Sequence, residues 1–103
     1  MIARDEGYGK YKRIIQKLAK IRSDVYNIDI SFANNQTRKN NMDDLTEIKH
    51  ELIRLDSELI KTIIEFNEKE DPDGLIRIED EFDKTYNLLN EIDVNLTKLK
   101  ESI

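Results

Sequence analysis

The sequence has no cysteine and no tryptophan, and only one proline and three glycines among its 103 residues. Without cysteine the chain can form neither disulfides nor thiolate metal sites. With so few prolines and glycines, long stretches hold nothing that interrupts a helix, whereas a β-fold of this size needs frequent turns. The composition therefore favours a helical rod or bundle.

Long apolar runs are also missing, since none approaches the roughly 20 residues that span a bilayer. The first residues, 1–4, lead directly into Asp5, Glu6 and Gly7 and not into the apolar segment of a secretory signal. We therefore expect no membrane association and a cytoplasmic location.

Residues arranged for catalysis or metal binding are scarce as well. His50 is the only histidine, and no glycine-rich phosphate loop is present. Residues 69–80 resemble an EF-hand calcium loop in the spacing of their acids and glycine, but Lys69 stands where the first carboxylate belongs and Asp80 where a bidentate glutamate belongs. We expect no metal, no cofactor and no enzymatic activity.

The chain does contain three long apolar seams, in which apolar residues recur at alternating steps of three and four. Such spacing places one stripe along one side of a helix. The first seam is Tyr11, Ile14, Leu18, Ile21, Val25, Ile28 and Phe32. The second is Leu45, Ile48, Leu52, Leu55, Leu59, Thr62 and Phe66. The third is Leu75, Ile78, Phe82, Thr85, Leu89, Ile92, Leu96, Leu99 and Ile103.

The seams change phase at two polar segments, which sets the predicted helix boundaries. Residues 34–41 lack any apolar residue and contain four asparagines, and we expect Asn41 to cap the second helix. Around Pro72, Asp71 or Asp73 should cap the third helix. The predicted helices cover about residues 8–33, 42–69 and 73–102 of a single domain, with Gly7 and Gly9 in a loose lead-in.

Folding the chain up, down and up about these segments brings the three seams together in layers. Leu55, for example, is predicted to be fully packed in a middle layer with Ile21 and Leu89. We therefore predict an all-α, antiparallel three-helix bundle with coiled-coil-like packing. The alternative is a long helix through residues 34–41, in a helical hairpin completed by dimerisation.

Charge is unevenly distributed. Residues 1–41 hold nine basic and four acidic residues, whereas residues 42–103 hold eight and eighteen. The basic start of the chain could contact nucleic-acid phosphates. However, the layers place it beside the acid-rich residues 65–83, and the net charge is −5, so we disfavour nucleic acid as a partner.

Several large aliphatic residues lie off the seams. Ile30, Ile64 and Val94 fall at the outermost heptad position, and Leu88 also lies off its seam. Large aliphatics gathered on the outside of a charged bundle indicate a partner surface. We therefore predict a non-enzymatic protein-interaction module: a small acidic adaptor, inhibitor or immunity-type regulator that binds a protein of unknown identity through these four residues. The alternatives are nucleic-acid binding through the first helix, and a structural subunit that forms a homo-oligomer through the same apolar surface.

Overall fold

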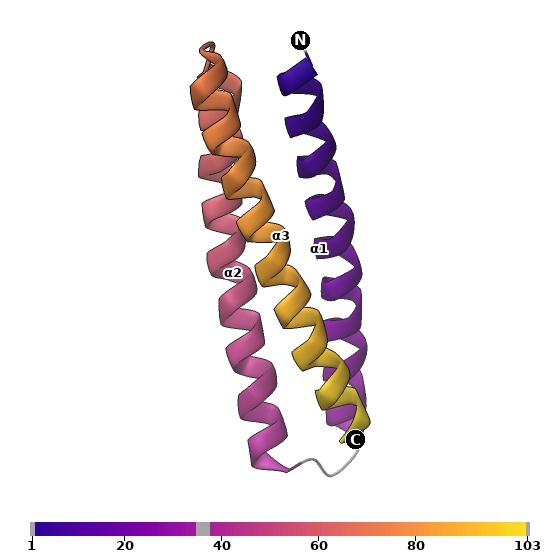
Figure 1. Ribbon diagram of the computed structural model, residues 1–103. Helices are drawn as coiled ribbons and strands as arrows, with labels where there is room; N and C mark the ends of the chain where they lie inside the picture. The colour runs from indigo at the N-terminus through magenta and orange to yellow at the C-terminus, as the bar shows by residue number, and fades with distance from the viewer. Residues whose placement is uncertain (1, 35–37, 103) are drawn as a thin grey trace.

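The computed structural model describes residues 2–34 and 38–102, which form a three-helix bundle measuring 54 × 18 × 16 Å (Figure 1). Helix α1 spans Ile2–Asn34, α2 spans Lys39–Glu68 and α3 spans Pro72–Glu101. In Figure 1 the chain runs down α1, up α2 and down α3, so its ends lie at opposite ends of the bundle. The predicted all-α, antiparallel three-helix bundle is confirmed.

The connection between α1 and α2 is a true break in the helix. Arg38 has an extended backbone and precedes the first residue of α2. The hairpin alternative, which needed one helix through residues 34–41, is therefore wrong. Residues 35–37 of the predicted loop lie outside the described residues.

Helix α1 begins at Ile2, earlier than the predicted start near residue 8, because Gly7 belongs to the packed interface. Gly7 lies seven residues before Ile14 and so continues the first seam. A Cβ atom on Gly7 would lie 2.3 Å from Cζ of Phe66, so only glycine leaves room for that ring. The Tyr8 ring meets Phe66 edge to face, with centroids 5.1 Å apart. The aromatic contact thus stabilises the helical turns that glycine weakens.

The caps of the other helices match the sequence only in part. Helix α2 is capped at Arg38, without a side-chain hydrogen bond, and Asn41 lies inside the helix, so its predicted capping role is wrong. At α3 the Asp71 carboxylate accepts a hydrogen bond from Gly74 N at 2.8 Å, and Pro72 occupies the first turn. This backbone hydrogen bond lowers the pKa of Asp71 below its ordinary value. The prediction that Asp71 or Asp73 caps this helix is confirmed for Asp71.

All three helices contribute to one apolar core, which follows the predicted seams except at a few positions. Its buried members are Ile14, Leu18, Ile21, Val25, Ile28, Leu45, Ile48, Leu52, Leu59, Phe66, Leu75, Ile78, Phe82, Leu89, Ile92, Leu96 and Leu99. Thr85, the polar position in the third seam, is buried and donates to the Glu81 carbonyl at 3.1 Å. Leu55 is only half-buried, against prediction, and so is Thr62, whose hydroxyl donates to Glu58 O.

Leu55 is less buried than its seam neighbours Leu52 and Leu59. Figure 1 shows α3 beside α2 at the hairpin and beside α1 at the other end of the bundle. Leu55 lines a hollow between α2 and α3, so the seam position alone does not bury it.

Candidate binding groove between α2 and α3

Two adjoining hollows lie between α2 and α3. One has a volume of about 430 Å³ and extends along α2 from Asn41 to Glu51. The other has a volume of about 360 Å³ and extends from Glu51 to Glu58. Both are lined by Glu51 and by Asn95 of α3, so they form one continuous surface, which we call the α2–α3 groove.

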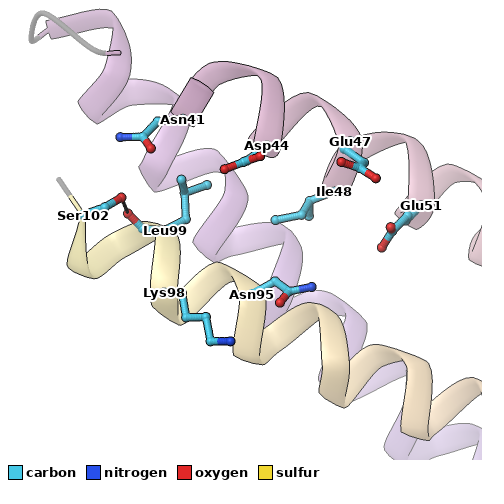
Figure 2. A pocket seen from close by; sticks show the side chains of 9 residues that line it. All are labelled: Asn41, Asp44, Glu47, Ile48, Glu51, Asn95, Lys98, Leu99 and Ser102. Atoms are coloured by element: carbon cyan, nitrogen blue, oxygen red, sulfur yellow. Dashed lines mark hydrogen bonds between the residues drawn. The ribbon is translucent and has the colours of Figure 1, made fainter. Parts of the chain in front are cut away.

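The hollow nearer the carboxyl end of α3 has polar walls over a narrow apolar floor (Figure 2). Asp44, Glu47 and Glu51 project from α2 on one side, and Lys98 lies on α3 opposite. The floor is formed by Ile48 and Leu99 of the core. Nearby, the Ser102 hydroxyl donates to the Leu99 carbonyl at 2.8 Å and not to a base that would activate it.

The second hollow is the more apolar one. Leu55 of α2 and Leu88 of α3 line it together with the core residue Ile92. Leu88 is 46% exposed, so a large aliphatic surface remains open to solvent within a concave site. Concave sites with an apolar base and a polar rim are the usual form of binding surfaces.

The groove carries an excess of negative charge that the protein does not neutralise. Its carboxylates are Asp44, Glu47, Glu51, Glu58 and Glu91, and its cations are Arg54 and Lys98. Within the described residues none of these seven side chains forms an ion pair. Five carboxylates against two cations leave an excess of negative charge along the groove, and such an excess creates a field that attracts an oppositely charged partner.

The neutralised contact between α1 and α3 shows that this excess is a local property. Lys17 Nζ lies 3.2 Å from Asp93 Oδ2, and Lys100 Nζ lies 3.1 Å from Asp24 Oδ1. The two contacts differ because basic and acidic residues alternate along the α1–α3 border.

At the hairpin end of the same contact, Lys10 Nζ lies 2.9 Å from Asp83 Oδ2. This hydrogen bond raises the pKa of Lys10 above its ordinary value. Glu79 nearby is buried, and its Oε1 has no hydrogen-bond partner among the described residues. Burial raises the pKa of Glu79, an effect that the positive charge of Lys10 partly offsets.

The four residues predicted to bind a partner are all exposed, but they lie on three helices. Ile30 is on α1, Ile64 on α2, and Leu88 and Val94 on α3. Ile64 is close to the hairpin and Val94 far from it, so at 1.5 Å per residue they are roughly 27 Å apart along the bundle. The structure therefore does not bring the four into one surface. Leu88 is the member that lines the α2–α3 groove.

The acidic wall of the groove was not predicted from the sequence, although its signal is present in the chain. Four acids recur every seven residues along α2: Asp44, Glu51, Glu58 and Glu65. Each directly precedes a buried residue of the apolar seam. In a heptad pattern this position borders a neighbouring helix. Only Glu65 of this column is paired, with Arg77 Nη2 3.2 Å away. The column could have been recognised, but which helix it borders depends on the fold.

The segment with calcium-loop spacing is mostly helix. Because α3 begins at Pro72, residues 72–80 wind along the bundle and do not surround an ion. Among residues 2–34 and 38–102, no group of three or more His, Asp or Glu side chains is placed to hold a metal ion. In the same residues, no helix is both long and apolar enough to cross a membrane.

Searches against protein-family models, curated proteins and solved structures give no match to this chain. The functional argument therefore depends on the geometry and charge of the bundle itself.

Proposed function

We propose that the protein is a non-enzymatic protein-binding module that recognises its partner through the α2–α3 groove. One observation carries the proposal: five carboxylates surround a partly apolar groove and form no ion pair with any described residue. Placing like charges together without partners disfavours the free protein slightly, and a bound partner of opposite charge would reverse that cost. An adaptor, inhibitor or immunity-type regulator acting in the cytoplasm fits this description.

The proposal revises the surface expected from the sequence. Leu88 stays in it, whereas Ile30, Ile64 and Val94 are placed outside it, on the outer faces of the three helices. Single exposed aliphatics are common on protein surfaces and need no partner.

Nucleic-acid binding through α1 is the weaker alternative. Lys10, Lys17 and Lys20 each pair with an aspartate of α3, and Arg22 pairs with Asp56 of α2. Non-specific binding needs cations that are free to meet phosphates. Most of the basic side chains near the start of α1 are instead used within the bundle.

Self-assembly as a structural subunit is the other alternative. The observation in its favour is that Ile53 and Ile60 of α2 are 66% and 59% exposed. Their separation along α2 is seven residues, which places them on one line of the helix. Sedimentation of the purified chain tests this possibility, because an assembly has a mass above 12.2 kDa.

The test of the main proposal is a capture experiment with matched variants. Leu88→Asp places a charge in the groove, whereas Ile64→Asp and Val94→Asp place the same charge on outer faces with similar exposure. Each variant is first checked for wild-type helicity by circular dichroism and then used to capture proteins from extracts of the native host.

We expect Leu88→Asp alone to lose a protein that the wild type retains. If Ile64→Asp or Val94→Asp loses the captured protein and Leu88→Asp retains it, the recognition surface lies on the outer faces and the proposal of the groove is wrong. Retention of every captured protein by all three variants would contradict it as well.

A further inference from the structure

The groove has the dimensions of a seat for one more helix. Its α2 wall runs from Asn41 to Glu58, which at 1.5 Å per residue is about 26 Å. Its α3 wall runs from Leu88 to Ser102, or about 21 Å. A helix of about 14–17 residues therefore matches the groove from end to end. Laid between α2 and α3, it would convert the three-helix bundle into a four-helix bundle.

The floor and walls specify the chemistry of that helix. Leu55 and Leu88 offer an apolar seat at one end of the groove. On the α2 side, Asp44, Glu51 and Glu58 form a column of carboxylates with a spacing of seven residues. A helix in contact with this column would meet it with lysines or arginines at the same heptad spacing, beside an apolar stripe that faces the floor.

We propose that the α2–α3 groove takes a basic amphipathic helix of a protein partner, which packs as a fourth helix with its apolar stripe on Leu55 and Leu88 and its cations against Asp44, Glu51 and Glu58. This inference depends on the proposed function and adds the class of partner. Phosphate-bearing ligands are disfavoured because they would meet the same carboxylates.

A second copy of the chain fits the groove less well. Its most basic segment is the start of α1, where four cations are already paired with aspartates of α3 and α2: Lys10, Lys17, Lys20 and Arg22. Of the basic side chains in residues 10–22, only Lys12 and Arg13 lie outside the ion pairs of the described residues. Two copies also carry a net charge of −5 each and repel one another. A separate basic helix has neither disadvantage.

The test uses a synthetic 17-residue peptide with leucines at heptad core positions and lysines beside them, labelled for fluorescence anisotropy. We expect saturable binding of the peptide to the intact protein. The affinity should fall at least tenfold when salt is raised from about 50 to about 500 mM, because the shorter Debye length screens the attraction between lysines and carboxylates. A peptide with glutamate in place of each lysine should not bind. Absence of binding by the lysine peptide, or equal binding by both peptides, would overturn the inference.

Charge-reversal variants localise the site. Glu51→Lys with Glu58→Lys changes the groove, whereas Glu68→Lys with Glu101→Lys changes the net charge equally at exposed positions that do not line it. We expect the groove pair to weaken binding at least tenfold and the control pair to weaken it less than threefold. Leu88→Ala, which leaves the charges intact, should also weaken binding. Equal loss in the two charge-reversal pairs would show attraction to net charge and overturn the inference.

The two proposals can fail separately. If Leu88→Asp loses a natural partner but the lysine peptide does not bind the wild type, the groove is a recognition site and the basic-helix inference is wrong. If neither the capture nor the peptide depends on the groove, both are wrong. If the wild type sediments above 12.2 kDa and the Glu51→Lys, Glu58→Lys pair does not, the occupant is a second copy, which also overturns the inference.

Discussion

Helix α3 makes two long contacts, and they differ in how their borders are charged. On the α1 side, Lys17 meets Asp93 and Lys100 meets Asp24, each side chain crossing toward the other helix. On the α2 side, five carboxylates face only the two cations Arg54 and Lys98 along the groove. Arg77 with Glu65 is the ion pair that spans this side among the described residues. Both contacts share the same apolar core.

The difference shows that apolar seams alone do not decide how closely two helices pack along their whole length. The seam buries the central side chains of all three helices. At the borders the two contacts differ, because ion pairs cross the α1–α3 border and hollows lie along the α2–α3 border. In this bundle the open edge is also the acidic one, and that coincidence underlies the functional proposal. Four measurements test how the surroundings of these residues differ across the bundle.

The largest difference is expected between Leu89→Ala and Leu55→Ala, two leucines that the seams place in one layer. Leu89 is fully buried, so its truncation should lower the free energy of unfolding by about 2–5 kcal/mol. Leu55 is half-buried at the groove, so its truncation should cost about 1 kcal/mol, a fraction of full side-chain burial. Urea denaturation followed by circular dichroism measures both. Equal losses would mean that the α2–α3 contact closes over Leu55.

The next effect concerns Gly7 and Gly9, which lie two residues apart in sequence and so on different sides of α1, in different surroundings. Gly7→Ala should destabilise the protein by about 1–3 kcal/mol, because the new Cβ overlaps the Phe66 ring. Gly9→Ala should stabilise it by up to about 1 kcal/mol, since a Cβ there meets nothing within 4 Å and alanine favours the helix. Thermal melts of the two variants test this pair. If Gly7→Ala is also stabilising, the first turns of α1 do not pack as described.

Glu79 is a buried carboxyl group whose Oε1 has no hydrogen-bond partner among the described residues. It should therefore make the free energy of unfolding depend on pH. Its raised pKa means that the folded protein holds a proton that the unfolded chain releases above the ordinary value of 4.5. Stability from this group is therefore present at low pH and lost as pH rises from 4.5 through the raised folded value.

Glu79→Gln removes this pH-dependent loss of stability. The variant should therefore be more stable than the wild type at pH 7 by on the order of 1 kcal/mol. Below about pH 4 the two free energies of unfolding should be equal. Subtracting the two pH profiles removes the contribution of the other carboxyl groups. A constant gap at all pH values would show that Glu79 does not titrate differently in the two states.

The smallest effect compares one acid from each contact. Asp93→Asn removes the partner of Lys17 and Lys20 and should cost about 0.5–1 kcal/mol at low salt. Glu51→Gln removes one of several like charges and should change the free energy of unfolding by less than about 0.5 kcal/mol, or raise it slightly. Urea denaturation of both variants at low and at high salt tests this, because salt screens the ion pairs and the difference between the variants should be smaller at high salt. If Glu51→Gln costs as much as Asp93→Asn, the groove acids have partners within the bundle.

Most of the architecture could be predicted from the sequence, because a long seam with a period near 3.5 needs helical partners along its whole length. Three seams in three phases favour three helices, and the turn before Pro72 follows from its own residues. The break near Asn34 stayed open until the structure showed the extended backbone of Arg38. The Asp71 cap is equally local, since it needs only the backbone of its own first turn. The acidic column from Asp44 to Glu65 was likewise present in the sequence.

Only the tertiary structure decided where the bundle stays open. In the sequence, Gly7 is a residue that weakens a helix. In the structure it contacts the ring of Phe66, 59 residues away in the chain, where only glycine leaves room. Leu55 occupies a core position of its heptad, yet it lines the hollow between α2 and α3 and is only half-buried. Heptad spacing fixes the direction of a side chain from its own helix axis, but burial also depends on the distance to the neighbouring helix. That distance is set by the packing of all three helices at once, so no single seam contains it.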